Sequence, residues 1–584
     1  MKKTKIVCTI GPATENEEVL KSLILAGMNV ARINFSHGSH EEHQAKIDLI
    51  KRVRDELEMP VAIMLDTKGP EIRTLNFENG EVLLEADQEF TITTREVVGN
   101  QNICGITYKN LPQDVKIDDR ILIDDGLIGL KVVKIINETD ILCVVENPGL
   151  VKNKKGVNVP SVQINLPALT EKDIADIKFG IRNGIDFIAA SFIRKPTDVL
   201  EIRKVLEEGD AADIHIISKI ENEEGVENID DIIELSDGVM VARGDLGVEI
   251  PAEDVPLVQK MIIQKCNLSG KPVITATQML ESMIKNPRPT RAEVTDVANA
   301  ILDGTDAIML SGETAIGKYP LNAVETMARI AVKIENSDSY KNRFGYLRTK
   351  NIAITNAISH ATGTIAMDLG VKAILTATSS GYTARSVSKF RPDALIIAAT
   401  PSFEVMRKLA LVWGVYSVYT EKMSSTDEAI EGSVQSSLKA GYLKQGELVV
   451  ITAGIPVGVV GGTNMIKVHV VGDIILKGTG LGKKPAVGKV CIANTPEEAQ
   501  AKFKEGDILV AIDTDKDMVE YMQKSSAILT ERGGLTSHAA VVGITIGKPV
   551  IVGIRDVTSV LKDGDLITVD TDRGLVFKGK ANIL

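Results

Sequence analysis

Two segments of the chain carry charged side chains at the end of an apolar run. One spans Ile216 to Glu221 and the other spans Val239 to Asp245. They lie one βα unit apart, so in a parallel sheet they form neighbouring strands with Lys219, Glu221 and Asp245 at a shared carboxyl edge. Carboxylate oxygens are ligands that Mg²⁺ prefers, and an ammonium group neutralises a phosphoryl group in transfer. The two segments therefore predict a site for a divalent metal and a phosphoryl group.

Eight short runs rich in β-branched residues alternate with helical patterns, which predicts parallel strands joined by crossover helices. The runs are residues 5–10, 29–35, 61–66, 186–191, 214–220, 238–243, 272–277 and 306–311. Eight such units indicate an α/β fold with a closed (β/α)8 TIM barrel, whose active site lies at the carboxyl ends of the strands. Two of the predicted helices carry capping-box signals, Thr14 with Glu17 and Thr170 with Asp173.

The other predicted strand ends add polar residues to the same edge. They are Arg32, Asn34, Ser36 and His37 after the second run, Asp66, Thr67 and Arg73 after the third, Gly244 after the sixth and Thr277 after the seventh. Alone, each charged residue is better explained as an ion pair at a strand end. Together they indicate a polyanion site, in which the basic side chains supply positive charge. A subset offers oxygens suited to a monovalent cation: Asn34, Ser36, Asp66 and Thr67.

The remaining chain divides into segments that differ in their pattern of polar and apolar residues. Residues 70–166 alternate in polarity and contain turn signals, which predicts an all-β insertion at the catalytic edge that could close as a lid. After residue 336, strand signals at 373–376 and 448–452 predict a second α/β domain. A Gly-rich segment, Lys477 to Lys484, is typical of a linker, and residues 485–584 follow it.

Composition excludes several classes of protein. The net charge of the 584 residues is −12, which argues against nucleic acid as the main partner. Five scattered cysteines without a CxxC motif are typical of reduced thiols in a cytoplasmic protein. The first residues lack the apolar stretch of a secretory signal, and the longest apolar run, Ala539 to Ile554, is interrupted by Lys548 and Pro549. We therefore expect no membrane association.

The strand-end motifs resemble those of the pyruvate kinase family. Matching stretches begin at Arg32 (RINFSHG), Leu65 (LDTKGPEIR), Ser218 (SKIEN), Ala242 (ARGDLG) and Thr275 (TATQML), with KKGVN at 154–158. The resemblance covers about residues 1 to 475. It implies a phosphotransferase that moves phosphate from phosphoenolpyruvate to ADP, giving pyruvate and ATP in the last step of glycolysis. It also implies a homotetramer with a catalytic barrel at 1–69 and 167–336, a β-barrel lid domain at 70–166 and an allosteric α/β domain at 337–475.

The resemblance also implies a role for each matching residue. Arg32 and Lys219 hold the phosphoryl group, and Glu221 and Asp245 bind Mg²⁺ or Mn²⁺. Thr277 and the backbone amides near Gly244 hold the substrate carboxylate. The K⁺ ligands are Asn34, Ser36, Asp66 and Thr67, and Glu71 matches the K⁺-requiring form. The nucleotide contacts are Asn34, His37, Arg73 and Lys155. The proton donor to the enolate is not named by sequence, and Thr277 acting through a water is one hypothesis. Arg243 we expect to be structural or at an interface.

A loop in the second α/β domain combines hydroxyls with a following helical run: Thr378, Ser379, Ser380, Gly381 and Thr383. A second loop, Thr452 to Gly458 with Gly461 to Asn464, has similar chemistry. Both can be ordinary Gly-rich turns, but the family carries an allosteric phosphosugar site in this domain. Because the two serines supply no charge, a monophosphate activator such as ribose 5-phosphate or AMP fits better than a bisphosphate.

Residues 485–584 resemble the swivelling phosphohistidine domain of pyruvate phosphate dikinase and phosphoenolpyruvate synthase. The carrying motif is Glu531 to Val542, in which His538 matches the phosphorylated histidine. A dikinase that uses phospho-His538 is therefore the rival hypothesis, although no segment is left for the ATP-grasp module it needs. A structural or regulatory appendage is the default interpretation. A third hypothesis, an inactive barrel kept as a metabolite sensor, is disfavoured by the intact Lys219, Glu221, Asp245 and Thr277.

Overall fold

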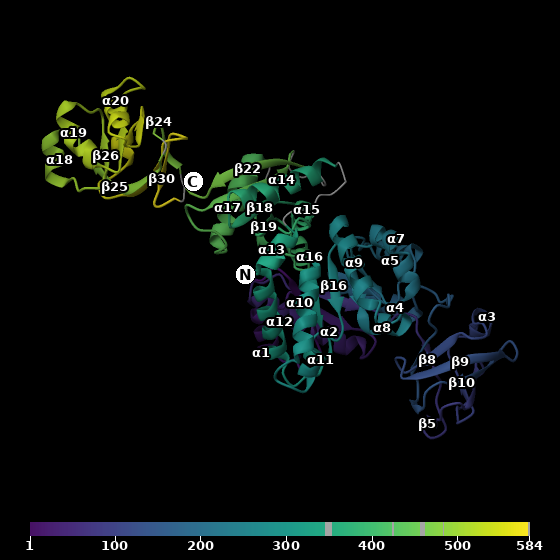
Figure 1. Ribbon diagram of the computed structural model, residues 1–584. Coiled ribbons are helices and arrows are strands. Elements are labelled where there is room, and N and C mark those ends of the chain that lie inside the picture. The colour runs from purple at the N-terminus through teal and green to yellow at the C-terminus, as the bar shows by residue number, and fades with distance from the viewer. Residues whose placement is uncertain (345–352, 423–424, 456–461, 473, 483, 582–584) are drawn as a thin grey trace. The chain divides into compact units, whose positions relative to one another are not determined.

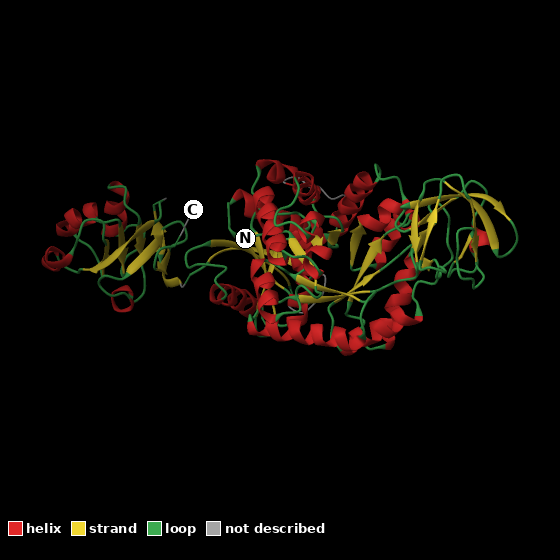
Figure 2. Ribbon diagram, turned by 90° about the horizontal axis from the view of Figure 1, so that it is seen from below, coloured by secondary structure: helices red, strands yellow, loops and turns green. Residues whose placement is uncertain are grey.

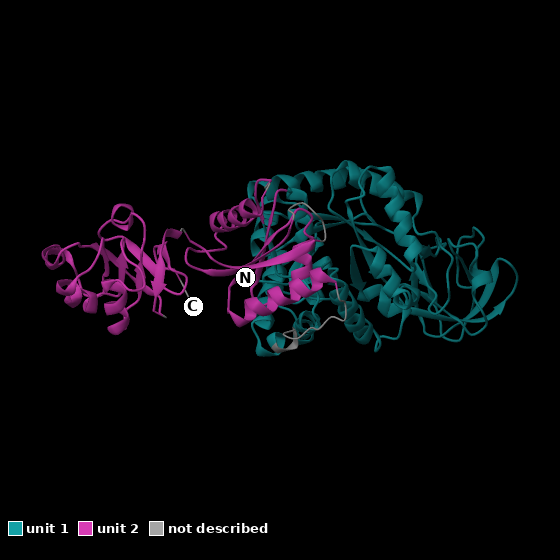
Figure 3. Ribbon diagram, turned by 90° about the horizontal axis from the view of Figure 1, so that it is seen from above, with its two compact units in different colours: residues 1–350, 388–391, 402–417 teal, residues 351–387, 392–401, 418–584 magenta. Residues whose placement is uncertain are grey.

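The computed structural model describes residues 1–344, 353–422, 425–455, 462–472, 474–482 and 484–581. The chain divides into two compact units (Figure 3). Unit 1 comprises residues 1–350, 388–391 and 402–417, and unit 2 comprises residues 351–387, 392–401 and 418–584. Every helix within the described ranges is too short or too polar to span a bilayer.

Unit 1 contains a closed barrel of eight strands in the order β1-β17-β16-β15-β14-β13-β3-β2, all paired in parallel. The strands are β1 (Lys5–Thr9), β2 (Val30–Asn34), β3 (Ala62–Asp66), β13 (Phe187–Ala190), β14 (His215–Ile220), β15 (Gly238–Ala242), β16 (Val273–Ala276) and β17 (Ala307–Leu310). Each of the eight predicted runs contains one of them, so the predicted TIM barrel is confirmed.

The barrel strands are mostly apolar because both of their faces are buried. Ile217 and Met240 belong to the cluster that fills the barrel interior, whereas Ile216 and Val239 pack outward. Helices surround the strands (Figure 2). They include α1 (Glu17–Ala26), α2 (His40–Glu56), α4 (Glu171–Arg182), α5 (Pro196–Glu208), α6 (Glu223–Glu227), α7 (Ile229–Leu235), α8 (Arg243–Glu249), α9 (Val255–Ser269), α10 (Arg291–Asp303) and α12 (Pro320–Glu335). This two-sided burial fixes the strand ends where the candidate site lies.

One of the two predicted capping boxes is correct. Thr170 caps α4 and forms a capping box with Asp173. At α1 the prediction is wrong, because Asn16 is the N-cap and its side chain accepts from the amides of Glu18 and Val19. Asn is as good a cap as Thr and stands directly before the helix, while the Thr14 hydroxyl bonds to the Gly11 backbone instead.

Between β3 and α4 the chain forms a group of strands with one short helix, α3 (Leu111–Asp114) (Figure 1). Seven strands form a sheet in the order β4-β12-β8-β9-β10-β6-β7, and β11 pairs with β5. They are β4 (Ile72–Arg73), β5 (Glu81–Leu84), β6 (Glu89–Thr93), β7 (Ile103–Gly105), β8 (Arg120–Ile123), β9 (Ile128–Ile135), β10 (Asp140–Val145), β11 (Gly149–Lys152) and β12 (Gly156–Asn158). The inserted segment is therefore β-rich, as its alternating pattern predicts.

Unit 2 contains strands β19, β18, β21 and β22 side by side in that order, with β22 antiparallel to β21. Their bounds are β18 (Ala373–Ala377), β19 (Leu395–Thr400), β21 (Leu448–Gly454) and β22 (Thr463–Val470). Helices α14 (Ile354–Asp368), α15 (Tyr382–Ser388) and α17 (Thr426–Lys439) accompany them. The two strand signals that the sequence gives in this region correspond to β18 and β21.

The last part of unit 2 is an eight-stranded sheet in the order β23-β30-β29-β25-β26-β27-β28-β24. Its strands are β23 (Ile474–Lys477), β24 (Thr479–Leu481), β25 (Ala486–Ile492), β26 (Ile508–Ala511), β27 (Ala527–Thr530), β28 (Val550–Val552), β29 (Leu566–Asp570) and β30 (Leu575–Lys578). Helices α18 (Pro496–Lys502), α19 (Val519–Lys524), α20 (His538–Thr545) and α21 (Val557–Val560) complete it. The predicted linker is wrong, because β23 and β24 pair with β30 and β28 within this sheet.

Candidate active site

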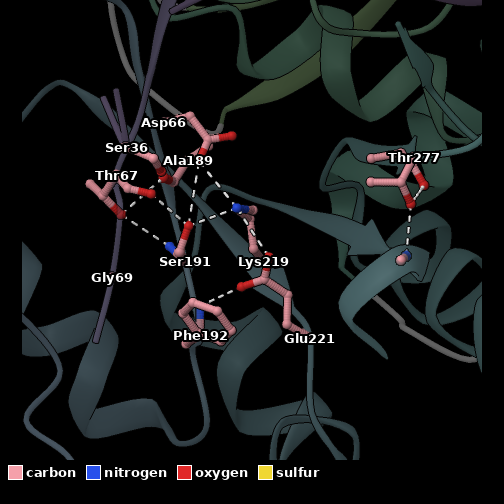
Figure 4. Close-up of polar contacts among 12 residues, drawn as sticks. Ser36, Asp66, Thr67, Gly69, Ala189, Ser191, Phe192, Lys219, Glu221 and Thr277 are labelled. Atoms are coloured by element: carbon pink, nitrogen blue, oxygen red, sulfur yellow. Dashed lines mark hydrogen bonds and ion pairs between the residues drawn. The ribbon is translucent and has the colours of Figure 1, made fainter. Parts of the chain in front are cut away.

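Lys219 is the centre of a buried polar network at the carboxyl end of the barrel (Figure 4). Its ammonium nitrogen Nζ donates to Ser191 Oγ at 2.7 Å and lies 3.0 Å from Glu221 Oε1 and 3.1 Å from Asp66 Oδ1. The Lys219 side chain is 12% exposed and the two carboxylates are 1% exposed. Burial alone lowers the pKa of Lys219, but the charges of Asp66 and Glu221 outweigh that effect and raise it. The lysine is therefore held as a cation.

Asp66 binds a second cation, Arg32, from the neighbouring strand β2. Arg32 Nε donates to Asp66 Oδ2 at 2.6 Å, and its Nη1 donates to Thr9 Oγ1 at 2.8 Å. Burial raises the pKa of Asp66, but Arg32 and Lys219 outweigh burial and lower it below its usual range. One carboxylate thus pairs with two positive charges at the carboxyl end of the barrel.

Glu221 and Asp245 form a pair of neighbouring carboxyl groups. The pKa of Glu221 is raised to about 7, mainly by burial. The charge of Lys219 lowers this pKa and the charge of Asp245 raises it further. Burial likewise raises the pKa of Asp245. The backbone amide of Phe192 donates to Glu221 Oε2 at 2.6 Å and orients it, since Phe192 has a left-handed backbone with φ of 56°. Two neighbouring acids that resist ionisation together are stabilised by a cation between them.

The donor set fits a divalent metal of the Mg²⁺ class. Among the described residues, no group of three or more His, Cys, Asp or Glu side chains is arranged to hold a metal. Two carboxylates are too few to surround a metal ion with protein ligands alone. They are enough for Mg²⁺, because Mg²⁺ keeps several waters and shares substrate oxygens. Glu221 and Asp245 are therefore the residues that would hold it.

The four residues expected to bind a monovalent cation come from the ends of β2 and β3. Figure 4 places Ser36 beside Asp66 and Thr67. The Asn34 side-chain oxygen Oδ1 accepts from the Ser36 amide at 3.0 Å. Thr67 is hydrogen-bonded to the end of β13. Its Oγ1 accepts from the Ser191 amide at 3.1 Å, and its own amide donates to the Ala189 carbonyl at 3.0 Å.

Thr277 lies at the end of β16 in a strained conformation. Its φ is 68° and that of Gln278 is 53°, in the left-handed region that β-branched residues avoid. Thr277 Oγ1 accepts from the Gly244 amide at 2.8 Å and donates to the Ala276 carbonyl at 2.6 Å. Such strain persists only where surrounding contacts enforce it, and it clusters at functional sites.

Arg243 helps to hold the strained backbone at Thr277 in place. It donates to the carbonyls of Ala276 and Thr277 at 3.2 and 2.7 Å, and it forms a bidentate pair with Asp296 at 2.6 and 2.7 Å. The expected structural role for Arg243 therefore agrees with its contacts, although these contacts support the site itself.

A cavity of about 450 Å³ lies between the β-rich insertion and the barrel. Its lining includes Arg73, Lys155 and Asp245 but not Asn34 or His37 among the predicted nucleotide contacts. Lys155 Nζ pairs with Asp124 at 2.8 Å, and Arg73 pairs with Glu71. Both bases are thus paired with carboxylates of the inserted segment.

Ser191 and Phe192, which follow β13, are not among the predicted site residues. Ser191 contacts three candidate site residues, and the Phe192 amide orients Glu221. Only their position in the sequence could have indicated a role in the site. The fourth predicted run ends at residue 191, at the same barrel edge as the other runs.

The candidate effector loop lies in unit 2, between β18 and α15. Thr378 Oγ1 accepts from the Gly381 amide at 2.9 Å, and the buried Thr383 hydroxyl bonds to Thr463 Oγ1 at 2.8 Å. Ser380 Oγ accepts weakly from the Tyr382 amide, and Ser379 is exposed. The second loop of this domain lies partly outside the described residues, from 456 to 461.

His538 is the first residue of α20 and is half-buried. Its Nδ1 lies 3.0 Å from Thr514 Oγ1. Ser537 caps the helix by accepting from the Ala540 amide, and the preceding loop from Gly533 to Thr536 is exposed.

Comparison with known proteins gives matches along most of the chain. Family models match for the barrel domain of pyruvate kinase (residues 1–324), the alpha/beta domain of pyruvate kinase (residues 356–469) and the mobile domain of PEP-utilising enzymes (residues 503–574). A pyruvate kinase of Bacillus licheniformis is 56% identical and one of Geobacillus stearothermophilus is 55% identical, each over 100% of both chains. A solved pyruvate kinase from Cryptosporidium parvum matches with a TM-score of 0.77 and 42% identity, over 80% of this chain and 96% of that one.

Proposed function

Because this chain belongs to the pyruvate kinase family and transfers phosphate from phosphoenolpyruvate to ADP, giving pyruvate and ATP, we propose that Lys219, Glu221 and Asp245 form the centre of its active site. One observation carries this proposal. At the carboxyl end of a closed barrel, the Lys219 ammonium contacts Glu221, which has Asp245 as its neighbouring acid. Proteins of this family use a divalent metal and K⁺.

The activity is tested by a coupled assay of pyruvate formation at physiological K⁺ and Mg²⁺. We expect turnover that depends on both cations and on ADP. No turnover under these conditions would instead favour the inactive sensor hypothesis.

In the proposed reaction Arg32 and Lys219 hold the phosphoryl group as it moves from phosphoenolpyruvate to ADP. Phosphoryl transfer needs positioning and charge neutralisation more than covalent help, and both cations are already oriented by Asp66. Mg²⁺ or Mn²⁺, held by Glu221 and Asp245, supplies Lewis-acid stabilisation when it is bound. Thr277 and the amide of Gly244 hold the substrate carboxylate.

We propose that Thr277 also delivers the proton to the enolate, acting through a water. Thr277→Ala is expected to slow the exchange of solvent protons into pyruvate by at least about tenfold, because general acids contribute about 10²- to 10⁴-fold. Exchange is measured by NMR of pyruvate in ²H₂O. Thr275→Ala is the matched control, since its hydroxyl lies on the same strand and bonds to Thr305. An unchanged exchange rate in Thr277→Ala would refute the role.

The other predicted site residues of the catalytic unit bind K⁺ and the nucleotide. Four oxygen donors bind K⁺: Asn34, Ser36, Asp66 and Thr67. The nucleotide binds at the cavity beside the insertion through Arg73 and Lys155, with contacts from Asn34 and His37. Residues 70–166 act as a lid domain on a catalytic barrel formed by 1–69 and 167–336. The enzyme is cytoplasmic and assembles as a homotetramer, which light scattering would test.

Residues 337–475 form the allosteric domain, in which Thr378, Ser379, Ser380, Gly381 and Thr383 bind a monophosphate activator. Ser379 and Ser380 are the two whose hydroxyls are least engaged. Adding ribose 5-phosphate or AMP to the coupled assay is expected to lower the phosphoenolpyruvate concentration needed for half-maximal rate. An unaltered rate curve with both compounds would exclude this class of activator.

We propose that residues 485–584 are a structural or regulatory appendage, not a dikinase module. With phosphoenolpyruvate labelled in its phosphate, we expect no acid-labile label on His538, and His538→Ala is expected to keep steady-state turnover. Label on His538 together with lost turnover in His538→Ala would establish the rival mechanism, in which His538 carries phosphate between two sites.

A further inference from the structure

Ser191 lies where the proposed phosphoryl site and the proposed K⁺ site meet. It follows β13, the strand between β3 and β14, and is 4% exposed. Its Oγ accepts from Lys219 Nζ at 2.7 Å and lies 2.7 Å from the Thr67 carbonyl oxygen and 3.4 Å from Asp66 Oδ1. Its amide donates to Thr67 Oγ1 at 3.1 Å. One small side chain therefore contacts groups assigned to two different ligands (Figure 4).

The donors and acceptors available on each group determine which atom donates in each of these hydrogen bonds. An ammonium has three N–H donors and no acceptor, so the Ser191 hydroxyl must accept from Lys219. Its own proton is then donated to the Thr67 carbonyl, which is nearer than Asp66. The three acceptors around Lys219 are Ser191, Glu221 and Asp66, one for each N–H. Of these three, only Ser191 is not a carboxyl group, and its contact is the shortest.

We propose that Ser191 is a positioning residue that couples the monovalent-cation group to Lys219. This inference rests on the proposed function of the site. Through one hydroxyl, the position of the Thr67 carbonyl is linked to that of the Lys219 ammonium. A cation bound by Thr67 and Asp66 thereby fixes the lysine that holds the phosphoryl group. Without the hydroxyl, two carboxylates alone orient the ammonium, and one of its buried N–H groups loses its partner.

The test compares Ser191→Ala with the wild-type full-length enzyme. We expect kcat to fall by about 10- to 100-fold, the loss expected for one hydrogen bond to a charged group. We also expect the K⁺ concentration for half-maximal rate to rise by about tenfold on the same basis. The second readout needs no turnover: the rise in Tm caused by K⁺ relative to tetramethylammonium, without substrate, is expected to shrink. Ser191→Cys replaces the hydroxyl with a larger, weakly bonding thiol and should change all three quantities in the same direction.

Two further variants separate coupling from a general structural effect. Ser218→Ala removes another buried hydroxyl, next to Lys219 in sequence, which bonds to Ser236 and is expected to leave the K⁺ dependence unchanged. Ser191→Thr retains a hydroxyl and is expected to restore part of the K⁺ response. A K⁺ constant and K⁺-induced Tm rise in Ser191→Ala equal to those of the wild type would overturn the coupling, whatever the kcat. A wild-type enzyme that turns over without any response to K⁺ would overturn the K⁺ assignment itself.

Discussion

Replacing Lys219 with methionine is expected to lower kcat by about 10³-fold or more, because loss of one preorganised charge donor in an active site costs about 10²- to 10³-fold and this one also orients its neighbours. Methionine keeps most of the length of the side chain and removes its charge. Steady-state kinetics in the coupled pyruvate assay measures the effect. A kcat within tenfold of the wild type would contradict the role of Lys219 at the phosphoryl group.

The same change has a structural cost that has to be measured separately. Lys219 lies between Asp66 and Glu221, and removing one partner of a buried pair leaves uncompensated charge, at about 3–5 kcal/mol. A lower Tm is therefore expected together with the lower kcat. Lys51→Met is the matched control, because it deletes a half-buried ammonium that donates to the Asn183 carbonyl outside the site. It is expected to leave kcat unchanged, so that a fall in kcat with this variant would point to general destabilisation.

The parts of the site that lie at the ends of two neighbouring strands could be predicted from the sequence. Lys219 and Glu221 are two residues apart, so the period of a strand places both on the same face. Neighbouring strands β14 and β15 then bring Asp245 close, because consecutive βα units in a barrel lie side by side. Local pattern was enough to predict that these three residues lie close together and to predict all eight barrel strands.

Other contacts depend on features that local pattern does not encode. Asp66 reaches Lys219 across β13, which separates their strands, and the uncharged Ser191 gives no signal of its own. The left-handed backbone of Phe192 and Thr277 involves residue types that rarely adopt it. The glycine-rich segment around Gly480 forms strands because distant partners, β28 and β30, pair with it, and tertiary pairing overrides weak propensity.

Asp245→Asn is expected to raise the Mg²⁺ concentration for half-maximal rate by at least about 10- to 100-fold, since even partners outside the metal's own ligands contribute that much. Asparagine keeps the shape of the side chain and removes one of two neighbouring charges. Titration of the coupled assay with Mg²⁺, and with Mn²⁺ in parallel, measures the change. Glu249→Gln removes another half-buried acid from the same cavity, where it accepts from Asn158 at 2.7 Å, and is expected to leave the Mg²⁺ requirement unaltered.

Stability without metal distinguishes a metal ligand from an acid that merely supports the fold. Because Asp245 raises the pKa of Glu221, the two acids repel each other, and removing one charge relieves that repulsion. The metal-free Tm of Asp245→Asn is therefore expected to equal or exceed that of the wild type, while the rise in Tm caused by Mg²⁺ is lost. A structural acid would behave in the opposite way, with a lower metal-free Tm and an intact response to Mg²⁺. That outcome would remove Asp245 from the proposed metal site and leave Glu221 without a second protein ligand.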